Sequence, residues 1–279
     1  MGQVSFWSPI SGQCSNTANA AVVASIIGLE YDIRTLLSQT KFSNSTLEQL
    51  FLKSKEKKIG ALYDYSDTGI DAMERLIRAN RLTPESIKNN SIPLEKDRLD
   101  LLLGTSKPDF ELYENLHHVV NALFQAASEY YQTIILDLQS GSNNILTKEL
   151  LRTSEVIIVS LTQNIDVLEQ FFVHKDLPNE MRNKKVMAVI SQYDQNSKYK
   201  LSNIKRHFKV DIPIYTIPYC TDFKDAFNDK DVLGWVRRNR NINKKHANYY
   251  FLSEVRRLAK GILDELGVNT QLKLIERGA

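Results

Sequence analysis

The sequence is poor in cysteine and lacks a long apolar run, and each absence argues against a class of protein. Its two cysteines, Cys14 and Cys220, stand apart without metal-ligand spacing, which favours a reducing, cytoplasmic setting over a disulfide scaffold. No run of roughly 18 apolar residues predicts a membrane-spanning helix. The first residues show no charged segment leading into an apolar one, so we expect no secretory signal. The net charge of +3 is too small to indicate nucleic-acid binding by itself.

Short apolar runs alternate with longer helical patterns along the chain. With 42% hydrophobic and 25% charged residues, the composition is that of an ordinary globular protein with a full core. The alternation predicts the α/β class, with a doubly wound, mostly parallel twisted sheet of about seven strands and helices on both faces. We expect one domain over residues 1–267 and a short tail over residues 268–279. The predicted strands are Val4–Trp7, Arg34–Leu37, Leu99–Leu103, Thr133–Asp137, Val156–Leu161, Lys185–Ile190 and Ile214–Ile217.

Three of the predicted helices bear on the later argument. The apolar spacing predicts helices at Thr17–Gly28, Phe110–Tyr131 and Lys245–Leu266. The segments around Pro93 and over Thr105–Pro108 are predicted to be plain connections.

The first strand leads into a loop with the order of a phosphate-binding cradle. Residues 4–30 place an apolar strand, a loop of small polar residues and a helix start in succession. Such a loop usually ends in G-K-[ST], where the lysine reaches the phosphates and the hydroxyl binds Mg²⁺. Here the pair is Asn16-Thr17, so the hydroxyl is kept and the lysine is lost. The loop therefore does not predict an efficient ATPase.

A second motif, TIILDLQSG over residues 133–141, is a strand that ends in Asp137 and continues into a loop of small residues. In phosphate-binding α/β proteins, an aspartate at this position holds Mg²⁺ through water, and the following loop senses the γ-phosphate. The other interpretation is an aspartate that caps the next turn. On the first interpretation Thr17 and Asp137 are the Mg²⁺ residues, and Gly141 belongs to the switch loop.

Together these motifs resemble the MinD/ParA-like deviant P-loop ATPases, and the resemblance covers nearly the whole chain. That family's loop has the form K-G-G-x-G-K-[ST]-T, of which only Gly12 and Thr17 are kept here. Ser11 stands where the family's signature lysine reaches the phosphate of a dimer partner, and Asn16 where the ordinary P-loop lysine lies. The resemblance implies a degenerate phosphate-binding set: Ser11, Gly12, Gln13, Cys14, Ser15, Asn16, Thr17 and Ala18.

Other positions of the family's site are matched in part. Ser38 and Thr40 stand at the positions after the second strand where the family carries acidic residues. The resemblance places ATP with Mg²⁺ in this site as the candidate ligand. The residues that it implies for the adenine side are Ser191, Gln192, Pro218 and Tyr219.

The loss of both lysines predicts a pseudo-ATPase, because charge-stabilising groups carry much of phosphoryl-transfer catalysis. We expect the pocket between the first strand and the first helix to have no positive side chain with which to offset a triphosphate. Among the family's branches, the chain is similar to the TadZ/CpaE proteins, which position Tad-type pilus or secretion machinery. This resemblance implies a cytoplasmic homodimer with protein partners in such an apparatus, located at a cell pole or recruited to the inner face of the membrane.

The basic C-terminal region supports an alternative. On one face, its positive side chains would bind DNA without sequence preference, as expected of a ParA-type partition ATPase that dimerises with nucleotide. A solvated surface is the simpler interpretation. The last helix either lies on a membrane or packs on the sheet, and we favour packing; Trp235 either anchors a partner or fills the core. The candidate DNA contacts are Arg237, Arg238, Arg240, Lys244 and Lys245.

Overall fold

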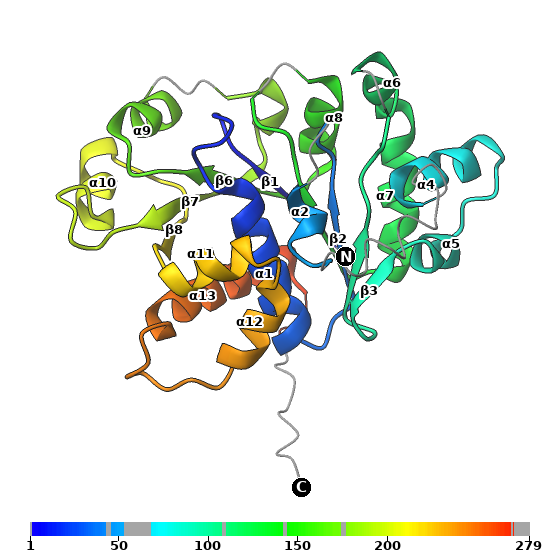
Figure 1. The fold of residues 1–279 in the computed structure, drawn as a ribbon. Coiled ribbons are helices and arrows are strands. Elements are labelled where there is room, and N and C mark those ends of the chain that lie inside the picture. The colour runs from blue at the N-terminus through cyan, green and yellow to red at the C-terminus, as the bar shows by residue number, and fades with distance from the viewer. Residues whose placement is uncertain are drawn as a thin grey trace, which may run out of the picture.

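The computed structural model describes residues 2–42, 46–52, 68–107, 110–141, 144–173, 177–268 and 270, and its centre is one eight-stranded sheet with helices on both faces (Figure 1). The strand order is β3-β4-β2-β5-β1-β6-β7-β8. All neighbouring strands are parallel except β3 and β4. The strands are β1 (Gly2–Trp7), β2 (Thr35–Gln39), β3 (Ile92–Glu95), β4 (Leu99–Leu102), β5 (Thr133–Asp137), β6 (Val156–Leu161), β7 (Lys185–Tyr193) and β8 (Ile214–Pro218).

The core forms two layers, one on each face of the sheet. The inner strands are buried on both faces, as the continuous apolar run of β6 predicts for a covered parallel sheet. One layer contains residues of α1 (Asn16–Glu30), α2 (Thr46–Gln49), α11 (Thr221–Asn228), α12 (Val232–Asn239) and α13 (Tyr249–Leu266). The other contains residues of α4 (Gly69–Arg78), α5 (Pro84–Asn89), α6 (Phe110–Glu114), α7 (His117–Tyr130), α8 (Ile145–Thr153), α9 (Ile165–Phe172) and α10 (Leu201–Phe208).

The structure confirms the fold class and adds one strand to those predicted. The eighth strand, β3, lies where the sequence predicted a plain connection around Pro93. It is an antiparallel edge strand, the position in a sheet where a proline is tolerated because no ladder hydrogen bond is lost on the open side.

Two helix predictions also need correction, and one helix was missed. The single helix predicted at Phe110–Tyr131 is divided into α6 and α7, and the apolar spacing hides the break because Tyr113 just before it and Leu116 within it are both buried. The short helix α12 was not predicted. The last helix starts at Tyr249 instead of Lys245. The prediction of one domain over residues 1–267 remains a prediction, and the tail, residues 268–279, lies outside the described residues except for 268 and 270.

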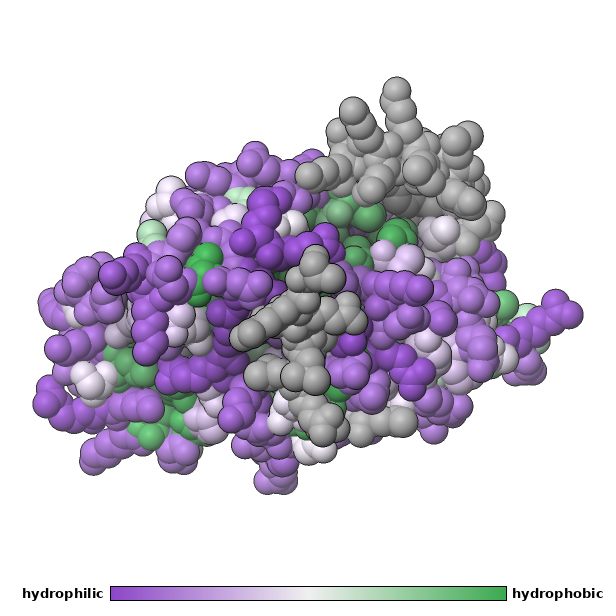
Figure 2. All heavy atoms as spheres, turned by 90° about the horizontal axis from the view of Figure 1, so that it is seen from below, coloured by the Kyte–Doolittle hydropathy of each residue, from purple (hydrophilic) through white to green (hydrophobic). Residues whose placement is uncertain are grey.

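The last helix packs against the sheet, as we favoured from its sequence. Its apolar stripe is buried against β8 and α1, and Phe251 contacts Phe223 and Trp235 with ring centroids 4.7 and 5.7 Å away. Trp235, 6% exposed, therefore belongs to the core. Figure 2 shows the lower face of the molecule as mainly hydrophilic, with hydrophobic residues in small separate groups. Among the described residues, no helix is long and apolar enough to cross a membrane.

Two glycines with the same backbone geometry allow a test of the packing. Gly69 begins α4 at φ 64°, and a Cβ there would lie 2.5 Å from the carbonyl oxygen of Leu103. Gly267 ends α13 at φ 63°, with nothing within 4 Å of such a Cβ. We expect Gly69→Ala to lower the free energy of unfolding by about 3 kcal/mol, from left-handed strain plus overpacking, and Gly267→Ala by about 1 kcal/mol, from strain alone. Urea denaturation measures the free energy of unfolding of both variants. Equal losses in the two would contradict the close approach of Gly69 to the Leu103 carbonyl oxygen.

Candidate phosphate-binding site

The sheet register brings three chain segments together at the carboxyl ends of neighbouring strands. Asp137, the last residue of β5, pairs with Phe6 of β1 on one side and with Gln39 of β2 on the other. The loop after β1 and the segment after β2 therefore leave the sheet on either side of Asp137. This edge of an open parallel sheet is where ligands bind in α/β proteins.

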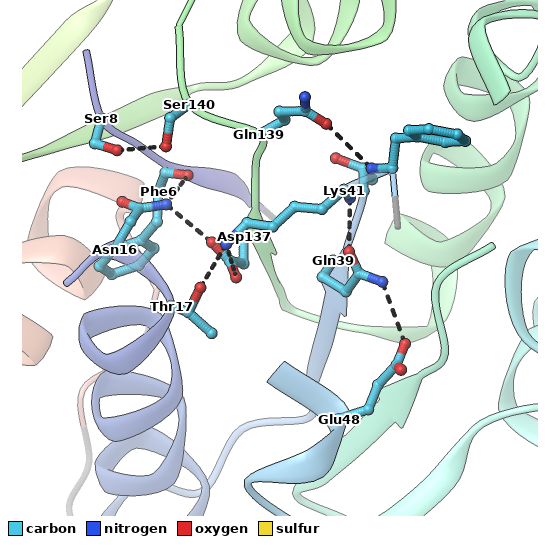
Figure 3. A network of polar contacts seen from close by, with 12 residues as sticks. Phe6, Ser8, Asn16, Thr17, Gln39, Lys41, Glu48, Asp137, Gln139 and Ser140 are labelled. Atoms are coloured by element: carbon cyan, nitrogen blue, oxygen red, sulfur yellow. Dashed lines mark hydrogen bonds and ion pairs between the residues drawn. The ribbon is translucent and has the colours of Figure 1, made fainter. Parts of the chain in front are cut away.

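The loops that follow β1 and β5 are tied to each other. The indole nitrogen of Trp7 donates a hydrogen bond of 2.9 Å to the carbonyl oxygen of Gly141. The hydroxyls of Ser8 and Ser140 lie 2.7 Å apart (Figure 3). Gly12 and Ser15 give the first loop its shape with φ values of 77° and 51°. The sequence predicted both loops, and the structure joins them.

Asn16 does not replace the missing lysine in function. Its amide nitrogen donates two hydrogen bonds of 2.9 Å, one to the carbonyl oxygen of Phe6 and one to Oδ1 of Asp137 (Figure 3). Because both neighbours are acceptors, the amide must face them with its nitrogen. At 6% exposure, Asn16 bridges β1 and β5 from beneath the loop and offers no charge to a ligand.

A lysine from the segment after β2 lies at the predicted magnesium position. The ammonium nitrogen of Lys41 is 2.7 Å from Oδ2 of Asp137 and donates a hydrogen bond to the hydroxyl of Thr17 (Figure 3). The Lys41 side chain is 20% exposed and that of Asp137 is 0% exposed. The expectation that the pocket between the first strand and the first helix has no positive side chain is therefore wrong, because Lys41 enters it from the segment after β2. The two residues predicted to hold Mg²⁺ are brought together, but they contact an ammonium.

The segment that carries Lys41 is held at three successive residues. The backbone nitrogens of Lys41 and Phe42 donate to the side-chain oxygens of Gln39 and Gln139 at 2.6 and 3.1 Å. The hydroxyl of Tyr113 donates to the carbonyl oxygen of Thr40 at 2.6 Å. These contacts fix the start of the lysine side chain. No motif spacing points to Lys41, because its partners Thr17 and Asp137 belong to α1 and β5, which are distant in the sequence.

A cavity of about 700 Å³ opens beside this ion pair. Its polar end is formed by the first loop and Lys41, and its apolar end by residues of β8, α11 and α13. Of the predicted site residues, Gln13, Asp137, Gly141 and Ser191 do not line it. Those that line it are Ser11, Gly12, Cys14, Ser15, Asn16, Thr17, Ala18, Gln192, Pro218 and Tyr219. Lining residues that the sequence did not predict include Ser8, Lys41, Phe42, Gln139, Ser140, Phe223, Lys224 and Phe251.

Two of the predicted residues are uncharged: Ser191 supports the loop from below, and Cys14 is part of the loop. Ser191, predicted on the adenine side, is 2% exposed; it donates to the carbonyl oxygen of Cys14 and accepts from Asn19, each at 2.8 Å. Burial raises the pKa of the Cys14 thiol to about 11, so this thiol is uncharged near neutral pH. Neither side chain supplies charge to the cavity.

The candidate DNA contacts are partly neutralised within the chain. Arg237 pairs with Glu95 at 2.7 Å and Arg238 with Asp231 at 2.9 Å. Lys244 and Lys245 are exposed and Arg240 is half-buried. Within the described ranges, no three His, Cys, Asp or Glu side chains cluster as a metal site.

Comparison with solved structures agrees with this architecture. A ParA family ATPase from Chlorobium tepidum TLS superposes with a TM-score of 0.67 at 16% identity, over 93% of this chain and 98% of that one. The chain has the fold of the ParA and MinD ATPases. The MinD protein of Pyrococcus horikoshii OT3 complexed with Mg-ADP gives a TM-score of 0.62 at 14% identity, over 94% and 95% of the two chains. The MinC:MinD cell division complex of Aquifex aeolicus gives a TM-score of 0.60 at 13% identity, over 98% of this chain and 99% of that one. No family model and no curated protein matches the sequence.

The Lys41–Asp137 pair leads to a stability prediction. We expect Lys41→Met to lower the free energy of unfolding by about 3 kcal/mol, because it leaves a fully buried carboxylate without its counter-charge. Adding Asp137→Asn to that variant should recover part of the loss, since the uncompensated charge is removed. Chemical denaturation at neutral pH measures the free energy of unfolding of the unaltered protein and of the two variants.

The matched control is Lys224→Met, at a lysine that lines the same cavity and lies 5.8 Å from the ring centroid of Tyr219. Its expected change is within about 0.5 kcal/mol. If Lys41→Met proves no more costly than this control, the ion pair does not have the role described here.

Proposed function

We propose that this chain is a degenerate MinD/ParA-type protein with weak or no ATP hydrolysis, which acts as a localisation or assembly factor for a Tad-type pilus or secretion apparatus. The observation that carries the proposal is the position of the Lys41 ammonium between Thr17 and Asp137. The Tad assignment is supported by the sequence resemblance alone.

The arrangement opposes phosphoryl transfer in two ways. First, Asn16 bonds inward, so no cation extends from the loop toward a γ-phosphate. Second, Mg²⁺ binds oxygen ligands at about 2.0–2.1 Å in octahedral geometry, and the oxygens of Thr17 and Asp137 already contact an ammonium. The residues present therefore do not fit a magnesium ion at this position. Positioned lysines on the loop and a bound metal supply much of phosphoryl-transfer catalysis, so the loss of both loop lysines and of the metal site removes the basis for turnover.

A role in positioning other proteins is supported by the surface near the site. Phe110 and Ile145 are 45% and 47% exposed, and Phe110 contacts Phe42 with ring centroids 5.5 Å apart. Exposed apolar residues at this edge provide area for a second copy of the chain or for a component of the apparatus. The MinD structure in complex with MinC is an example of this fold bound to another protein.

The proposal predicts that the purified protein with ATP and Mg²⁺ releases phosphate at the rate of a protein-free blank. Adding DNA should leave the rate unchanged. The single change Asn16→Lys should not create turnover, because Lys41 still contacts Thr17 and Asp137. Steady turnover stimulated by DNA would reject the proposal and support the DNA-partition ATPase instead.

The localisation role needs a cellular measurement. A fluorescent fusion of the chain in its native host should form a discrete focus that coincides with the pilus or secretion apparatus. Deletion of the chain should disperse that apparatus. A matched variant, Lys244→Glu with Lys245→Glu, alters two exposed lysines of the candidate DNA surface and should leave the focus in place. A focus that follows the chromosome and is lost in this variant would again favour DNA binding.

A further inference from the structure

We propose that the cavity binds a nucleoside diphosphate without a divalent cation, with the Lys41 ammonium in the position of the metal. The inference rests on the proposed function in one respect, which is that the site has no catalytic magnesium. It adds a ligand class and a mode of binding to that site.

The geometry of Lys41 leaves a donor for a ligand. Within the described structure its nitrogen has two oxygen neighbours, on Thr17 and Asp137. An ammonium carries three N–H groups, so at least one remains. Lys41 lines the cavity and its side chain is 20% exposed, so this group is accessible from the cavity. A magnesium ion in the same place would likewise connect these two residues to a phosphate.

The loop supplies further groups that favour an anion. The cavity is lined by Gly12, Ser15 and Thr17, at the N-terminus of the 15-residue helix α1. Backbone N–H groups and the helix dipole stabilise a phosphate at such a position. The lining also contains Lys224, which adds a second positive charge. These groups bind phosphate without any metal.

The charge balance in the cavity favours a ligand with few phosphates. Lys41 and Asp137 cancel each other, whereas Mg²⁺ beside the same carboxylate would leave a net positive charge. Among the described lining residues the one cation besides Lys41 is Lys224, so a third phosphate brings negative charge that no further described lining residue offsets, and a diphosphate should bind at least as well as a triphosphate.

The opposite end of the cavity suits a planar base. Pro218, Tyr219, Phe223 and Phe251 line it, and Tyr219 is 52% exposed. Its volume of about 700 Å³ is in the range of small-molecule sites. An anion-binding end and an apolar end in one cavity match the two halves of a nucleotide.

The test compares ADP binding by calorimetry in excess EDTA and in excess Mg²⁺, with ATP as the second probe. For the unaltered protein we expect the dissociation constants for ADP in the two buffers to agree within about twofold. We also expect ATP to bind no more tightly than ADP. In Lys41→Met, ADP affinity in EDTA should fall about tenfold or more, as expected for the loss of a charged hydrogen bond. Mg²⁺ should then restore part of it, because Thr17 and Asp137 become available to the metal.

The control is Lys244→Met, an exposed lysine outside the cavity, which should bind ADP like the unaltered protein. Circular dichroism checks that Lys41→Met is folded. If this variant does not fold, the comparison of ADP binding by the unaltered protein in the two buffers still decides whether ADP binds without a divalent cation. Binding that requires Mg²⁺, or no binding of ADP in either buffer, overturns the inference. Either result leaves the proposed function to be tested by its own turnover and localisation experiments. ATP hydrolysis, in contrast, would overturn both this inference and the proposed function.

Discussion

The ion pair between Lys41 and Asp137 is the interaction on which the site depends. A carboxylate with no exposed surface needs a counter-charge, since an unpaired buried ion is strongly unfavourable. In a metal-dependent site of this kind the counter-charge is a diffusible cation, but here it is covalently part of the chain. A tethered ammonium is present at high effective concentration whatever the ligand or metal level. The segments after β2 and β5 are therefore joined by contacts within the chain itself.

This constraint gives the altered residues of the loop a common explanation. Asn16 bonds to Phe6 and to the other oxygen of Asp137, so the carboxylate is satisfied from two sides by the protein itself. Switching by nucleotide needs differential contacts between two states. When the chain supplies those contacts itself, little remains for a γ-phosphate or metal to change. A fixed shape of this kind suits the localisation or assembly role that we propose.

Much of the fold was predictable from the sequence because buried parallel strands are continuous apolar runs. The seven predicted strands are present, and the loop and Asp137 lie at the carboxyl edge of the sheet as expected. The edge strand β3 was missed because it is short and contains Pro93. The roles of Lys41 and Ser191 were not predictable, since they depend on how β2 and β7 are placed relative to the loop after β1. Local sequence patterns carry no information about such contacts between distant segments.

The most direct test of the account is a crystal soaked in Mn²⁺ with ADP, in which anomalous scattering locates the metal. We predict no anomalous peak between Thr17 and Asp137, and density for the Lys41 ammonium within hydrogen-bond distance of both. A manganese peak bound to Asp137, with Lys41 turned away, would contradict the account.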